Sequence, residues 1–373
     1  MKRLRTPILT RALAPLLARL LARGLAMGVV VFSGGVSSIA QAPSAHALEE
    51  NAVVASIKPV HSLVAAVMQG VGSPHLIVRG GASPHTYSLR PSDARKLQQA
   101  KAIFWIGDEL ETFLAKPVAS LSKDAKLVTL SEAHGLTRLK FREGGPFEAH
   151  GHEDDDHQSK GHQAKGHDDA EQHDDHKSEH DEKEHAEEHG HSDEHEHGHD
   201  EIDMHVWLDP LNAKAMVHEI EETLATIDPA NAATYETNAR RLATQLDALT
   251  AEVAAELAPV RNSPFVVFHD AYQYFEARFG MSAAGSITVN PDAIPGAQRV
   301  AEIQKRVREL GGTCVFAEPQ FEPRLVKVVI EGTDAKSAVL DPLGAGLHDG
   351  PELYFQLIRN MSTAFTGCLS KPS

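Results

Sequence analysis

Cysteine and basic side chains are both scarce in this chain of 373 residues. Only Cys314 and Cys368 are present, and a metal site built from thiolates needs more cysteines than this, which argues against such a site. Lys and Arg number 36 against 52 Asp and Glu, giving a formal net charge of -16. Because the resulting field repels phosphate backbones, we expect no nucleic acid partner.

Long apolar runs are also lacking. The run at 24–36 has about a dozen residues, fewer than the roughly 20 that a bilayer span needs. The first 47 residues carry six basic and no acidic side chains, and Ala45-His46-Ala47 has the small-x-small form of a signal-peptidase site. We therefore predict a signal peptide over 1–47, with an anchoring helix as the alternative. No later run could span a bilayer and no cysteine near the cleavage site could carry a lipid, so we expect a soluble product in a bacterial periplasm, without stable membrane insertion.

Export also bears on the two cysteines. An exported chain with an even number of cysteines usually pairs them, because the compartment is oxidising. We predict a disulfide between Cys314 and Cys368 that pins the C-terminal tail.

Histidine and acidic residues are concentrated in one segment, 148–203. It holds 22 acidic residues, 4 Lys and 14 of the 23 histidines. Without hydrophobic periodicity it cannot bury enough surface to offset its ordering entropy, so we expect a disordered insert. Closely spaced imidazoles flanked by carboxylates suit weak, reversible zinc capture. The clearest such imidazoles are those of His189, His191, His195, His197 and His199.

Short apolar runs alternate with helical patterns in two series, which favours an α/β fold with mostly parallel sheets. The expected strands are 53–57, 76–78, 103–107 and 127–130, then 265–269, 287–289, 314–318 and 338–341. Between the series, leucines at three-and-four spacing predict a long helix over 228–259, with Asp228 as N-cap. We predict an N-terminal lobe over 48–227, a rigid connecting helix over 228–259 and a C-terminal lobe over 260–373. Each lobe has its own sheet flanked by helices.

Polar residues at strand ends are the first candidates for a site, because ligands bind beyond the carboxyl ends of parallel strands. His269 and Asp341 end apolar runs, and His85 and His205 lie in segments expected to be loops. All four would face a cleft between the lobes. His61 follows the first expected strand and is a further candidate.

Glu318 closes the run at 314–317. It is better suited to accept an N–H from a ligand imidazole than to bind metal itself, since metal-bound histidines usually donate their other N–H to such a group.

Six motifs carry a resemblance to a known family: GASPHTYSLRPSD at 81–93, MHVWLDP at 204–210, FHDAY at 268–272, VNPDAIPGAQR at 289–299, CVFAEPQF at 314–321 and LDPLG at 340–344. With the histidine-rich insert in its usual place, the chain resembles the metal-binding proteins of cluster-type ABC uptake systems, most closely the high-affinity zinc-uptake type. The resemblance spans nearly the whole mature chain.

The resemblance implies that His85, His205 and His269 are three zinc ligands, with a carboxylate or water as the fourth. Some members have Glu just before the first ligand histidine, and this chain has Pro84 instead. Asp341 matches the aspartate that binds metal in the manganese branch, so either Asp341 or water would complete the shell. Three neutral imidazoles with at most one oxygen suit Zn²⁺ better than Mn²⁺.

The resulting prediction is a periplasmic solute-binding protein that captures Zn²⁺ and delivers it to a membrane permease powered by a cytoplasmic ATPase. We expect a monomer that catalyses no reaction. One alternative is a zinc buffer or metallochaperone that works mainly through the insert. A second alternative is a zinc hydrolase, against which the absence of an HExxH-type helix argues.

Overall fold

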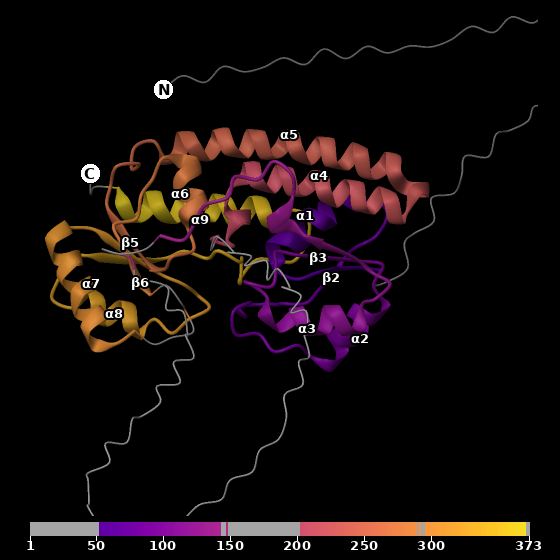
Figure 1. Ribbon diagram of the computed structural model, residues 1–373. Coiled ribbons are helices and arrows are strands. Elements are labelled where there is room, and N and C mark those ends of the chain that lie inside the picture. The colour runs from indigo at the N-terminus through magenta and orange to yellow at the C-terminus, as the bar shows by residue number, and fades with distance from the viewer. Residues whose placement is uncertain (1–51, 143–146, 148–201, 289–290, 292–294, 371–373) are drawn as a thin grey trace, which may run out of the picture. The chain divides into compact units, whose positions relative to one another are not determined.

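The computed structural model describes residues 52–142, 147, 202–288, 291 and 295–370 (Figure 1). All of them belong to one compact unit of the chain, Ala45–Ser373. The predicted signal peptide at 1–47 lies outside the described residues, and so does the predicted insert except for its last two residues. Within the described segments, no helix combines the length and the apolar character that crossing a membrane requires.

The first sheet has four parallel strands in the order β2-β1-β3-β4. Its strands are β1 (Val53–Ala55), β2 (His75–Leu76), β3 (Ala102–Trp105) and β4 (Lys126–Thr129). The connecting helices are α1 (Lys58–Val67), α2 (Pro91–Gln99) and α3 (Thr112–Leu121), and a 3-10 turn, η1 (Leu130–Glu132), follows β4. The two central strands are buried over their whole length, as their continuous apolar sequences predict for a parallel sheet covered on both faces.

The second sheet repeats this topology, with four parallel strands in the order β6-β5-β7-β8. Its strands are β5 (Phe265–His269), β6 (Ser286–Thr288), β7 (Cys314–Ala317) and β8 (Lys336–Val339). The helices that follow them are α6 (Gln273–Phe279), α7 (Ala297–Leu310), α8 (Arg324–Ile330) and α9 (Leu353–Leu369). The predicted α/β fold with two parallel sheets is confirmed.

The strands of the second sheet send alternate side chains to two different cores. Val266 and Phe268 pack in a small cluster with α7 and α8, while Phe265 and Val267 belong to the large core that also contains the first sheet. Phe365 of α9 stacks edge-on against Phe265, with ring centroids 5.0 Å apart. Helix α9 therefore covers the inner face of this sheet, on which Phe265 and Val267 lie.

The predicted disulfide is confirmed: Cys314 of β7 is bonded to Cys368 near the end of α9. The two Cα atoms are 6.2 Å apart and the residues are separated by 54 positions. The bond ties the C-terminal helix to the inner face of the second sheet.

Two long helices lie between the sheets in sequence and run side by side (Figure 1). They are α4 (Pro210–Ile227) and α5 (Ala232–Leu257), with 3-10 turns η2 (Val206–Leu208) and η3 (Pro229–Asn231) before each. Helix α5 also packs against α1, which follows β1 of the first sheet, and against α9, which follows β8 of the second sheet.

The long helix begins later than its sequence pattern predicts. Asp228 does not cap a backbone N–H; its carboxylate accepts hydrogen bonds from the Asn231 side chain and the Tyr235 hydroxyl, and η3 precedes α5. Helix α4 was not predicted at all, although Asp209 caps it by accepting from the Leu211 N–H at 2.8 Å and Pro210 occupies its first turn.

Candidate functional site

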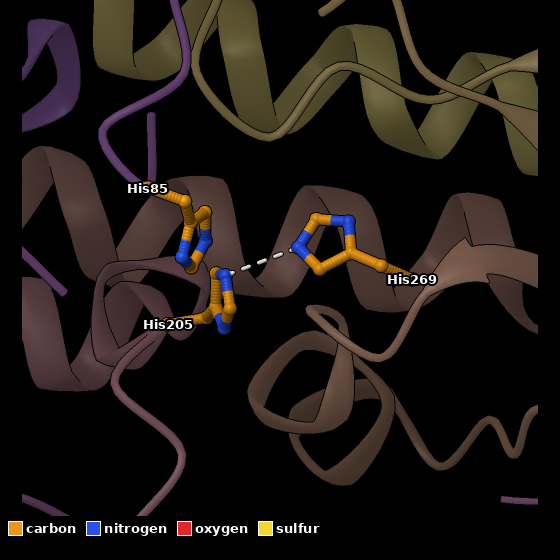
Figure 2. Close-up of side chains that lie close together, drawn as sticks. All are labelled: His85, His205 and His269. Carbon is orange, nitrogen blue, oxygen red and sulfur yellow. Dashed lines mark hydrogen bonds between the residues drawn. The ribbon is translucent and has the colours of Figure 1, made fainter. Parts of the chain in front are cut away.

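Three histidines from distant parts of the chain converge on one point (Figure 2). His269 is the last residue of β5, His205 directly precedes η2, and His85 lies in the loop between β2 and α2. One ring nitrogen from each lies within 4.8 Å of the other two. Within the described part of the chain, this is the group of histidine, cysteine and acidic residues that could hold a metal ion.

The spacing of two of the rings fits a tetrahedral ion. The Nε2 atoms of His205 and His269 are 3.3 Å apart. Two ligands about 2.0–2.1 Å from a tetrahedral zinc ion are themselves separated by about 3.3 Å. The His85 ring lies slightly farther away: its centroid is 5.7 Å from that of His205 and 5.9 Å from that of His269, whereas those two are 5.2 Å apart.

Buried carboxylates orient two of the three rings. Glu318 Oε1 lies 2.6 Å from His269 Nδ1, and Asp203 Oδ1 lies 2.7 Å from His205 Nδ1. All four residues are buried. A carboxylate at Nδ1 favours the tautomer with hydrogen on that atom, which leaves Nε2 as the donor for a metal. Both Nε2 atoms then face the centre of the group.

The same contacts set the protonation of the site. Burial lowers the pKa of His269, but the Glu318 carboxylate, together with Asp270 and Asp203, outweighs burial and raises the pKa above its ordinary value of 6.5. Burial, with the neighbouring His205 and His269 rings, holds the pKa of His85 well below 6.5. Protons therefore compete with a metal ion for Nε2 of His269.

The three rings line a small cavity. Its volume is about 10 Å³, close to what one water molecule occupies by the same measure. Its walls combine the ligand candidates with apolar and neutral side chains: Ser83, Pro84, His85, His205, Trp207, His269, Glu318, Gln320, Phe321, Pro342 and Leu343. The cavity has room for one small ion, and the three imidazoles supply nitrogen donors for it.

Two predicted candidates are not brought into this group. Asp341 neither belongs to it nor lines the cavity: its Oδ1 accepts from Gln320 Nε2, and its Oδ2 accepts from the Ala345 N–H at 2.6 Å. His61 lies within α1, and its Nε2 is 3.1 Å from the Pro74 carbonyl oxygen. The five histidines named in the insert lie outside the described residues.

The sequence motifs did not identify Asp203 as part of the site. Its Oδ1 accepts from both the backbone N–H and Nδ1 of His205, and its own N–H donates to the Leu139 carbonyl. Ile202 pairs with Lys140 across an antiparallel bridge. The last two residues of the predicted insert are therefore part of the site's support. An aspartate two residues before a candidate ligand is the signal that could have found it.

Polar contacts join residues that precede α4 to residues that follow α5. Trp207 Nε1 donates to the Pro342 carbonyl at 2.9 Å. Lys58, which is buried, donates to the Leu347 carbonyl at 2.7 Å. The guanidinium of Arg142 forms ion pairs with the buried carboxylates of Asp270 and Glu276.

The two parallel sheets and the group of three imidazoles define an α/β protein whose histidines could hold a metal ion. A family model described as "ZnuA: Zinc-uptake complex component A periplasmic" matches residues 53–368. The chain belongs to this family.

Two relatives show how far the sequence similarity extends. A high-affinity zinc uptake system protein ZnuA of Brucella suis is 58% identical over 323 residues, covering 87% of this chain and 93% of that one. A protein of the same name from Yersinia pestis is 36% identical over 326 residues, covering 86% of this chain and 92% of the other.

Solved structures show the same fold at lower identity. A crystal structure of ZnuA aligns with a TM-score of 0.64 at 22% identity, over 85% of this chain and 98% of the other. The periplasmic zinc-binding protein TroA of Treponema pallidum aligns with a TM-score of 0.64 at 18% identity, over 86% and 99%.

Proposed function

We propose that this protein captures Zn²⁺ in the periplasm and presents it to an uptake transporter. The observation that carries the proposal is the pair of Nε2 atoms of His205 and His269, which lie 3.3 Å apart at a small cavity that the His85 ring also lines. Family membership and the zinc uptake function of the relatives support the same conclusion.

The donor set favours zinc over manganese. Three imidazole nitrogens with one oxygen match the tetrahedral preference of Zn²⁺, whereas Mn²⁺ prefers more oxygens and higher coordination. Both oxygens of Asp341 accept hydrogen bonds from its own loop, whose turn they stabilise. We therefore assign the fourth position to water rather than to this carboxylate.

The transported ion needs a partner to receive it. We propose a membrane permease driven by a cytoplasmic ATPase, with export of this chain directed by a signal peptide at 1–47. Contacts of Trp207, Lys58 and Arg142 join residues before α4 to residues after α5. Release should therefore involve the loop that carries His85 rather than a wide separation of the sheets.

The histidine-rich insert has a separate role in this proposal. It collects zinc weakly and reversibly, while the cavity holds one ion tightly. Removal of 148–201 should leave the tight site intact, because Ile202 and Asp203 remain and Lys140 still pairs with Ile202.

Chelator-competition zinc titration of the full chain and of the chain without 148–201 tests both statements. We expect one tight site in each, and its loss in His269→Ala. His61→Ala is a matched control, since His61 is also buried but lies outside the group, and it should keep the tight site. If the shortened chain has no tight site, the insert is the zinc binder and the buffer interpretation replaces ours.

A further inference from the structure

Gln320 brings an unsatisfied oxygen to the wall of the metal cavity. The residue follows β7 and lines the cavity beside His269 and Glu318. Its side-chain Oε1 is buried, and among the described residues it has no hydrogen-bond partner. Leaving a buried acceptor unsatisfied is costly, so such an atom calls for a donor that the protein itself does not supply.

The direction of the Gln320 amide is fixed by Asp341. Nε2 of Gln320 donates to Asp341 Oδ1 at 2.9 Å. The same carboxylate also accepts from the backbone N–H groups of Leu343, Gly344 and Ala345. An acceptor on this side excludes the flipped amide, because a flip would place Oε1 against the carboxylate. Oε1 is therefore the atom left for another partner.

Two of the three rings of the loaded site have no N–H left for this oxygen. The Nδ1 atoms of His205 and His269 face Asp203 and Glu318, and their Nε2 atoms would bind the ion. A water molecule bound to the ion can supply the donor. Water on zinc is a strong hydrogen-bond donor, because the metal polarises its O–H bonds.

We propose that Gln320 Oε1 accepts a hydrogen bond from the water that completes the coordination of Zn²⁺, which makes Gln320 a binding residue of this site and Asp341 its positioning residue. The inference rests on the proposed zinc function. An amide oxygen can accept a hydrogen bond from this water but does not take its proton. The ion is then bound without the added negative charge that a carboxylate ligand would bring.

Gln320→Met tests the inference in the full chain, because methionine has a similar length and no oxygen. We expect the tight zinc site to weaken by about tenfold, the lower end of the effect of removing a group that supports a metal ligand. Gln304→Met is the matched control: Gln304 is also half-buried, and its amide donates to the Val328 and Glu331 carbonyls away from the cavity. The control should change the zinc affinity by less than about twofold.

Two further readouts separate a binding role from a structural one. The melting temperature of zinc-free Gln320→Met should stay close to that of the parent. The substitution removes an unsatisfied oxygen as well as the hydrogen bond to Asp341, and Asp341 keeps its three backbone donors. In a crystal structure of the zinc-loaded parent, Oε1 should lie within hydrogen-bond distance of a water on the ion.

Unchanged zinc affinity in Gln320→Met, or a loaded site with no water near Oε1, would overturn the inference. Neither result would affect the proposed function, which fails only if the parent chain has no tight site that His269→Ala removes.

Discussion

Glu318 offers a sharp test of how the protein prepares its imidazoles for metal. The carboxylate holds His269 Nδ1 at 2.6 Å, and both side chains are buried. Glu318→Gln keeps the shape and an acceptor oxygen but removes the charge. A charge-assisted hydrogen bond contributes about 1.5–3 kcal/mol and a neutral one about 0.5–1.5 kcal/mol, so the substitution should cost about 1–1.5 kcal/mol of ligand positioning and basicity.

That difference corresponds to about a tenfold loss of zinc affinity at alkaline pH. The loss should shrink at lower pH. Protons compete with zinc for His269, and the raised pKa of this ring in the parent makes the competition stronger there than in the variant. The affinity ratio between parent and variant should therefore be larger at pH 8 than at pH 6.

Zinc titrations by chelator competition at these two pH values measure the ratio directly. Glu111→Gln serves as the matched control, because Glu111 is fully buried but lies outside the cavity, and it should leave zinc affinity within about twofold. Equal affinities of parent and Glu318→Gln at pH 8 would refute the reasoning, and so would a ratio that grows as the pH falls.

Three further predictions concern stability and can be read from chemical denaturation. Replacing Cys314 and Cys368 by serine should lower the free energy of unfolding by about 4 kcal/mol, because the bond spans 54 positions; no loss would mean that the bond does not constrain the unfolded chain. Arg142→Met leaves two buried carboxylates without their cation and should lower the free energy of unfolding by about 3–5 kcal/mol. Arg359→Met removes an exposed ion pair and should lower it by less than about 1 kcal/mol. Equal losses in the two variants would contradict this prediction. Burial raises the pKa of Glu111 from 4.5 to about 7. Between these values the folded state binds more protons than the unfolded state, so stability should fall by up to about 3 kcal/mol as the pH rises, and Glu111→Gln should abolish that slope.

The repeated strand–helix rhythm was enough to predict both sheets. Apolar runs such as that of β5, whose predicted bounds of 265–269 match the structure, identify strands because a parallel strand buries both faces. Helix α4 escaped prediction, although its buried residues Met216, Val217, Ile220 and Leu224 follow helical spacing.

The histidines could be selected from motifs, and Glu318 could be selected as an acceptor for one of them. Asp203 lies only two residues before His205, so its contact with that ring is local. Gln320 acts through a contact with Asp341, 21 positions away, which no local pattern encodes. Asp341 shows the converse: a residue at a strand end has the right place for a ligand, but both of its oxygens are used by its own loop. Burial and hydrogen-bond direction decide whether such a residue can bind the ion, and both are known only from the three-dimensional structure.

Zinc X-ray absorption on the chain without 148–201, loaded with one equivalent of Zn²⁺, tests the central claim most directly. The account predicts a four-coordinate ion with three imidazole nitrogens and one oxygen at about 2.0–2.1 Å, and His269→Ala should lose one imidazole from that shell. A six-coordinate, oxygen-rich shell, or a spectrum that is unchanged in His269→Ala, would contradict the account.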